Sequence, residues 1–349
     1  MPIPFETMMH EKPHTNVRDL RFGQDASLQF GTQLGRFCVF TMEIPWKVTR
    51  TKLGGTPEAV FFVETMEEAW LETVCASLPP CDVIVGVGGG MAIDAAKYVS
   101  WRKELRLVSI PTILSVDAFT TPAAGIRRNH EVHYVGETSP DPLIIDFGIL
   151  RTAPKELNIA GIGDLFSMHT ACYDWHLAQT RGKSEFPFDR KAIQRARQIL
   201  DTLEGLLPEI RENTDRGLMA IVEGYIDLNT ICLPAGHFRV EEGSEHYLFY
   251  ELEERLQRPF VHGYIVGLGI YVMSQWQENH FAHIRDQMNA VGLPYQPADL
   301  GIQREDLLAS ILSLRAYVAT RPKLWYTCIQ DREISREWAE EAIASLRFN

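Results

Sequence analysis

The fold is decided by Val83-Ile84-Val85-Gly86-Val87-Gly88-Gly89-Gly90-Met91-Ala92-Ile93-Asp94-Ala95-Ala96-Lys97. Apolar residues that favour β-structure lead into a cluster of glycines, and an alanine-rich segment with helical periodicity follows directly. This pattern predicts a strand, a tight turn and a helix. Glycines let the backbone approach a phosphate, and the free N–H groups at the start of a helix bind anions. The turn is therefore either a pyrophosphate-binding site or an ordinary strand-to-helix turn that is rich in glycine.

The rest of the chain divides into two parts of different character. Further short apolar segments predict strands at 35–43, 59–63, 106–112 and 143–146, with helical patterns at 19–35 and 66–78. After Pro154, helical patterns continue to the end of the chain. We therefore expect an α/β, Rossmann-like nucleotide-binding domain over residues 1–153, opened by an extended arm at 1–17, and an all-helical metal- and substrate-binding domain over 154–349.

Composition limits the possible functions and partners. A chain of 349 residues is longer than one hydrophobic core usually supports, which agrees with two domains. The net charge of −12 argues against a nucleic-acid partner. The sequence has no apolar run of the roughly 18 residues that a membrane helix needs and no secretory signal at Met1–Glu6, so we expect a cytoplasmic protein without a membrane partner. The six cysteines show no C-x-x-C spacing, and we expect them to be reduced and buried.

Three segments of the helical half combine acids or histidines with glycines and apolar residues. They are Ala160–Ser167, which contains Asp164, Glu242–His246, and Pro259–Gly269, which contains His262. A buried carboxylate is costly unless it is paired or bound to a cation. One acid and two histidines, Asp164, His246 and His262, would hold a divalent ion and leave a position open for catalysis. The alternative for each histidine is an ordinary core residue with satisfied hydrogen bonds.

The glycine pattern GGG-x-x-x-D-x-x-K at Gly88–Lys97 resembles the superfamily of dehydroquinate synthases, iron-containing alcohol dehydrogenases and glycerol-1-phosphate dehydrogenases. Gly163-Asp164, the Gly-Ser-Glu-His segment that ends at His246, His262-Gly263 and Arg321–Ile329 are similar to the last of these families, over nearly the whole chain. The resemblance implies Zn²⁺, or another divalent ion such as Fe²⁺ or Ni²⁺, at Asp164, His246 and His262. It also implies NAD or NADP as cofactor and a homo-oligomer.

The resemblance also assigns roles to individual residues. It places the cofactor pyrophosphate and nicotinamide against Gly88, Gly89, Gly90, Met91, Ala92, Ile93, Asp94, Thr112, Ser115 and Thr121. Asp117 matches a carboxylate that touches substrate, although Ala118 follows it where the family has glycine. Tyr250 stands where the family has a second histidine, four residues after His246. Tyr250 either contacts the substrate or only fills space.

Together these features predict a metal-dependent, NAD(P)-linked oxidoreductase. It would interconvert an alcohol and a ketone or aldehyde on a small polyol, phosphorylated or not, with Asp117 and Tyr250 as the candidate catalytic residues. One alternative is a lyase or cyclase of the dehydroquinate synthase type, which recycles its bound dinucleotide. The other is a relative that binds ligands without catalysis.

Overall fold

The computed structural model describes residues 6–9, 15–128 and 131–349. The chain forms two compact units. Unit 1 comprises Met1–Asn158 with Tyr225–Thr230, and unit 2 comprises Ile159–Gly224 with Ile231–Asn349. The predicted boundary after residue 153 stays a prediction. Of the predicted arm at 1–17, residues 6–9 form strand β1, and residues 1–5 and 10–14 lie outside the described part.

Unit 1 is built on a mostly parallel sheet. Its strand order is β1-β2-β9-β6-β5-β3-β4, and among the described strands of this sheet only β1 pairs antiparallel. The strands are β1 (Glu6–Met9), β2 (Asp19–Gly23), β3 (Phe37–Thr41), β4 (Ala59–Phe62), β5 (Val83–Gly88), β6 (Arg106–Pro111) and β9 (Pro140–Asp146). The helical pattern predicted from residue 19 is wrong at its start, because Leu20–Gly23 pair with Leu143–Asp146 of β9.

Each face of this sheet carries its own hydrophobic core, which agrees with the almost entirely apolar sequences of the central strands β3 and β5. Along β3, Cys38 and Phe40 pack with one core and Phe37 and Val39 with the other. The elements outside the sheet are α1 (Ala26–Gly31), α2 (Glu43–Thr49), α3 (Glu68–Ser77), α4 (Gly90–Lys103), the short 3₁₀ helix η1 (Asp117–Phe119), α5 (Phe147–Leu150) and the hairpin of β7 (Ala124–Arg128) and β8 (Glu131–Val135).

The strand order reverses beside the glycine-rich segment. From β3 the chain moves outward to β4, and from β5 it moves the opposite way to β6 and β9, while β3 and β5 are neighbours. In open α/β sheets, ligands bind outside the carboxyl ends of the strands at such a reversal. The turn after β5 therefore lies at the position where open α/β sheets bind ligands.

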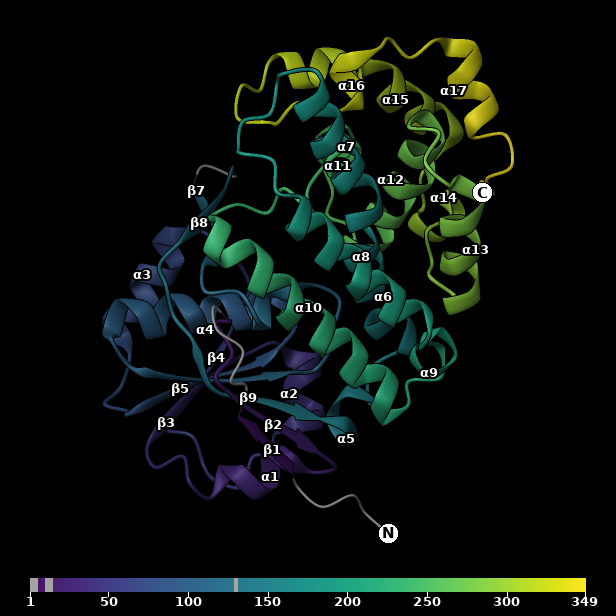
Figure 1. Cartoon of the computed structure of the whole chain (residues 1–349). Helices are drawn as coiled ribbons and strands as arrows, with labels where there is room; N and C mark the ends of the chain where they lie inside the picture. Colours follow the sequence, from purple (N-terminus) through teal and green to yellow (C-terminus); the bar gives the residue numbers. More distant parts are fainter. Residues whose placement is uncertain (1–5, 10–14, 129–130) are drawn as a thin grey trace. The chain divides into compact units, whose positions relative to one another are not determined.

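Unit 2 is helical, and Figure 1 shows its helices in teal, green and yellow. The helices from residue 155 onward are α6 (Lys155–Phe166), α7 (Met168–Thr180), α8 (Arg190–Glu204), α9 (Leu207–Arg211), α10 (Asp215–Ala235), α11 (Ser244–Leu256), α12 (His262–Trp276), α13 (Phe281–Val291), α14 (Pro297–Leu300), α15 (Arg304–Ala319), α16 (Cys328–Asp331) and α17 (Arg336–Ala342). An α/β unit with a helical unit confirms the predicted fold class.

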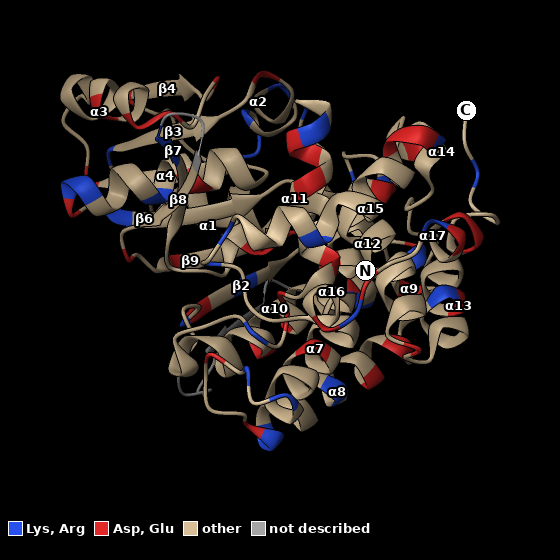
Figure 2. Ribbon diagram, turned by 90° about the horizontal axis from the view of Figure 1, so that it is seen from above, with Lys and Arg blue, Asp and Glu red and all other residues tan. Residues whose placement is uncertain are grey.

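The expectation that no segment is long and apolar enough for a membrane helix is wrong for α10, which meets that criterion by length and composition alone. However, 72% of its most apolar window is buried inside the protein, as in the core helix of a globular protein. Figure 2 shows the acidic and basic residues scattered along the chain rather than gathered on one element.

Candidate metal centre and nucleotide-binding turn

Three helices of unit 2 bring Asp164, His246 and His262 together. Asp164 lies near the end of α6, His246 in the first turn of α11, and His262 is the first residue of α12. Asp164 Oδ1 lies 3.6 Å from His246 Nε2 and 3.0 Å from His262 Nε2. One donor atom from each residue lies within 4.8 Å of the others. Residues separated by up to 98 positions in the sequence thus form one cluster.

Glycines set this geometry by letting the helix backbones touch. A Cβ at Gly163 would lie 1.9 Å from the carbonyl oxygen of Gly263, and a Cβ at Gly263 would lie 1.7 Å from that of Ala160. No side chain larger than hydrogen fits at either position. Since Asp164 and His262 are the chain neighbours of these glycines, the close crossing of α6 and α12 holds the two side chains together.

The carboxylate and imidazole groups of this cluster shift one another's pKa values. Burial of Asp164 by itself raises the pKa of its carboxyl, but the adjacent His262 and His246 imidazoles outweigh burial and lower that pKa. Burial likewise disfavours the charged form of His246, but the adjacent carboxylates of Asp164 and Glu245 raise its pKa well above the usual value. The site therefore stabilises positive charge beside a carboxylate, and a divalent cation supplies such charge.

The donor set fits a divalent ion. Ligand atoms about 2.0–2.2 Å from a tetrahedral zinc ion lie about 3.2–3.6 Å apart, and the two carboxylate–imidazole distances of 3.6 and 3.0 Å are close to this range. Asp164 and His246 are buried, whereas the His262 side chain is 27% exposed. An ion held here is thus reachable from one side.

The start of α11 is held by buried acids. Glu245 Oε1 accepts from the backbone N–H of Gly243 and lies 2.9 Å from His246 Nδ1. Asp174 of α7 accepts from the backbone N–H groups of Ser244 and Cys328, so one carboxylate caps both α11 and α16. Burial of the Asp174 carboxyl raises its pKa, and the negative charge of Glu245 raises it further.

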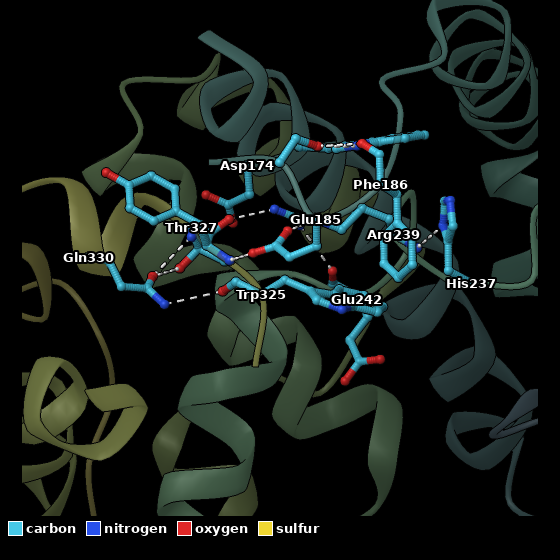
Figure 3. A network of polar contacts seen from close by, with 12 residues as sticks. Asp174, Glu185, Phe186, His237, Arg239, Glu242, Trp325, Thr327 and Gln330 are labelled. Carbon is cyan, nitrogen blue, oxygen red and sulfur yellow. Dashed lines mark hydrogen bonds and ion pairs between the residues drawn. The ribbon is translucent and has the colours of Figure 1, made fainter. Parts of the chain in front are cut away.

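A buried arginine, Arg239, lies in the segment before α11. Figure 3 shows Arg239 among Glu185, Glu242 and Trp325. Its guanidinium donates to the carbonyl oxygens of Glu242 and Tyr326, and its Nε lies 4.0 Å from a carboxylate oxygen of Glu185. Arg239 thereby ties the 321–329 segment to the segment that leads into His246.

Tyr250 lies on the same face of α11 as His246, with their rings 6.2 Å apart between centroids. Its hydroxyl donates to Glu242 Oε1 over 2.6 Å. Neither Glu242, the partner of this phenol, nor Glu245 carries a role predicted from the sequence. The adjacent Glu-His pair at the start of a helix is the signal from which a role for Glu245 could be predicted.

The glycine turn lies between β5 and α4 in unit 1. Gly89 is the N-cap of α4 and has no side chain with which to cap the helix. A Cβ at Gly89 would lie 2.8 Å from Ile113 Cδ1, and one at Gly90 would lie 3.0 Å from Val116 Cγ1. Gly88 adopts φ +156°, which side chains disfavour. Met91, Ala92, Ile93 and Asp94 follow in the first turns of α4.

The segment that follows β6, Thr112–Thr121, is rich in hydroxyl groups and is hydrogen-bonded to this turn. Thr112 donates its backbone N–H to the carbonyl of Gly88, and Ser115 is nearly buried three residues later. Lys97 is buried, pairs with Asp94 at 2.7 Å and donates to the Thr121 carbonyl. Asp117 begins η1 between these residues. The predicted cofactor residues Gly89–Asp94 and Thr112 thus follow the carboxyl ends of β5 and β6, two neighbouring strands.

Comparison with known proteins decides the family. A protein of Aeropyrum pernix named glycerol-1-phosphate dehydrogenase (NAD(P)+) is 31% identical over 278 residues, covering 80% of this chain and 76% of that protein. The chain belongs to the glycerol-1-phosphate dehydrogenase family. A relative of the same name from Methanosphaera stadtmanae is 29% identical over 280 residues, covering 80% of this chain and 78% of the relative.

Other comparisons show a related sequence model and solved structures of the same fold. The sequence model of the iron-containing alcohol dehydrogenase family matches residues 52–154. A probable glycerol dehydrogenase from Sinorhizobium meliloti has the same fold, with a TM-score of 0.68 and 23% identity over 92% of this chain and 93% of that one. An iron-containing alcohol dehydrogenase from Corynebacterium glutamicum gives a TM-score of 0.70 at 16% identity, over 98% of this chain and 96% of that one. The predicted family and enzyme class, an NAD(P)-linked oxidoreductase, are confirmed.

Proposed function

We propose that this chain catalyses hydride transfer between NAD(P) and a small polyol or polyol phosphate, with a divalent ion held by Asp164, His246 and His262. The observation that carries the proposal is the convergence of these three donors within 4.8 Å in a glycine-packed site. A divalent ion bound there supplies Lewis-acid polarisation of the alcohol or carbonyl oxygen. Zinc is the proposed ion, and Fe²⁺ and Ni²⁺ are the alternatives to be compared by metal analysis.

The dinucleotide is proposed to lie over Gly88, Gly89 and Gly90. Support comes from the reversal of strand order at β3 and β5 and from the uncapped start of α4. The remaining assigned residues, Met91 to Asp94, Thr112, Ser115 and Thr121, are proposed cofactor contacts because they follow β5 and β6 at the same sheet end.

Asp117 and Tyr250 are the proposed catalytic side chains. Tyr250 Oη and Glu242 Oε1 lie 2.6 Å apart, so a proton can pass along this pair. Asp117 is proposed to contact the substrate.

We further propose a cytoplasmic homo-oligomer acting on small molecules. All six cysteines are free and buried, as expected in a reducing compartment. The exposed Val132 and Tyr134 share one face of β8 and offer apolar surface for a second copy. Light-scattering measurement of the molar mass tests the oligomer.

The decisive experiment measures formation of reduced cofactor. The purified protein, loaded with zinc, is incubated with NAD+ or NADP+ and with glycerol 1-phosphate, glycerol or other polyols. Stoichiometric reduction of added cofactor by one substrate supports the dehydrogenase. A lyase would convert its substrate without net reduction of added cofactor, and a non-catalytic relative would bind ligands without turnover.

A further inference from the structure

The two ring nitrogens of His246 have different neighbours. Nε2 faces Asp164 Oδ1 at 3.6 Å, on the side of His262. Nδ1 lies 2.9 Å from Glu245 Oε1. Only Nε2 is therefore placed to bind an ion shared with the other two donors. Binding through Nε2 requires the neutral ring to carry its proton on Nδ1.

The carboxylate of Glu245 is held where it can accept that proton. Glu245 is fully buried, and its Oε1 also accepts from the backbone N–H of Gly243 over 2.7 Å. A Cβ at Gly243 would lie 3.0 Å from Glu245 Oε2 and 2.8 Å from Ala171 Cα, so glycine makes room for the folded-back side chain. The acid and the imidazole are thus oriented by the start of α11 itself.

Burial of the Glu245 carboxylate destabilises the folded protein. Its Oε2 is buried and has no hydrogen-bond partner among the described residues. A buried, incompletely bonded carboxylate destabilises a protein unless it interacts with a compensating group. The capping of α11 is already carried by Asp174, through the N–H of Ser244. Contact with His246 therefore remains the distinguishing role of Glu245.

We propose that Glu245 is a positioning residue for the metal centre. Its carboxylate accepts the Nδ1 proton of His246, which fixes the ring and leaves Nε2 unprotonated toward Asp164 and His262. This inference rests on the proposed metal-dependent function. Carboxylates in this role typically contribute about 10- to 100-fold to metal affinity.

Metal affinity is the primary test, and Asp174 provides the matched control. Metal-free wild type, Glu245→Ala, Glu245→Gln and Asp174→Asn are titrated with Zn²⁺ against a chromophoric chelator, and their Co²⁺ absorption spectra are recorded. We expect Glu245→Ala to lose about 10- to 100-fold in affinity and to alter the Co²⁺ bands. Glu245→Gln should recover most of the affinity, because its amide oxygen still accepts from Nδ1. Asp174→Asn should lower the melting temperature but keep the wild-type affinity and spectrum.

Each contrary result has a distinct meaning. Wild-type affinity in folded Glu245→Ala, or an equal loss in Asp174→Asn, would overturn the positioning role while leaving the metal site in place. Failure of wild type to bind Zn²⁺ or Co²⁺ would overturn the proposed function and this inference with it. Should Glu245→Ala not fold, nitrogen NMR of histidine in the zinc-loaded wild type decides. A protonated Nδ1 on His246 supports the proposal, and a metal-bound Nδ1 overturns it.

Discussion

Gly163 and Gly263 touch backbone to backbone, so the next residue along α6, Asp164, and the preceding residue on α12, His262, share a hydrogen bond of 3.0 Å. The distance between two candidate ligands is therefore set by their glycine neighbours. Any Cβ at this crossing must push the helices apart.

Gly163→Ala should accordingly weaken both the fold and the metal site. The added Cβ would lie 1.9 Å from a carbonyl oxygen, and overpacking of this kind costs about 1–3 kcal/mol. Urea unfolding and zinc stoichiometry measure the two effects. Gly205→Ala is the control, since its Cβ would meet its nearest atom at 3.5 Å, an ordinary contact. Equal stability and full zinc content in Gly163→Ala would contradict this account of the crossing.

His262→Ala should remove the metal and leave the fold largely intact, because the His262 side chain is 27% exposed and leaves little cavity. Metal analysis after dialysis should show a loss of zinc, and circular dichroism should be unchanged. His283→Ala is the matched histidine control, because His283 is 57% exposed on α13 and lies outside the cluster. A full equivalent of zinc in His262→Ala would exclude this residue as a ligand.

The wild type should also be stabilised by the ion itself. A ligand that binds only the folded state at about 100 times its dissociation constant adds about 2.7 kcal/mol. Removal of metal by a chelator should therefore lower the melting temperature, and return of Zn²⁺ should restore it. The His262→Ala variant should not respond. A response of equal size in the variant would place the stabilising ion elsewhere.

The sequence could predict the fold class because both of its signals are local. The run Val83–Lys97 encodes strand, turn and helix within one segment, and helical periodicity after Pro154 persists to the end of the chain. Strand β2 could not be predicted in this way, because its partner, β9, lies more than a hundred residues away. Short strands of this kind are determined by pairing rather than by their own pattern.

The candidate ligands could be named from the sequence because glycines flank acids and histidines in apolar segments. Their supporting groups could not be predicted. Glu245 reaches His246 only because its side chain folds back to Gly243, and Asp174 reaches Ser244 across 70 residues. Contacts of this type depend on side-chain rotamers and on helix packing, which periodicity does not encode.

Gly89→Ala should weaken dinucleotide binding. The methyl group would lie at the turn between β5 and α4, where the proposed pyrophosphate approaches, and would also press on Ile113 at 2.8 Å. We expect a loss of at least tenfold, or about 1.4 kcal/mol, for NAD(H) and NADP(H) by calorimetry. Gly86→Ala controls for packing, since its Cβ would press on Ala96 at 2.9 Å inside the strand. Unchanged affinity in a folded Gly89→Ala protein would place the pyrophosphate elsewhere.

Tyr250 should decide which polyol the enzyme prefers. Its hydroxyl donates to Glu242 Oε1, so the polar group one turn beyond His246 is a phenol bound to a carboxylate. A neutral phenol donates one hydrogen bond and carries no positive charge to attract a phosphate. We therefore expect weak turnover of glycerol 1-phosphate and faster turnover of a substrate with a neutral hydroxyl at that end, because a hydroxyl can donate to the phenol oxygen while the phenol donates to Glu242.

Two substitutions test this expectation by steady-state kinetics. Tyr250→His should shift the ratio of kcat/KM towards glycerol 1-phosphate, because an imidazole paired with Glu242 gains positive charge. Tyr250→Phe removes only the hydroxyl, and the loss of one hydrogen bond between the phenol oxygen and the substrate, about 0.5–1.5 kcal/mol, should lower kcat/KM on the preferred substrate roughly 2- to 13-fold. Efficient use of glycerol 1-phosphate by the wild type, together with a silent Tyr250→Phe, would show that Tyr250 only packs against His246.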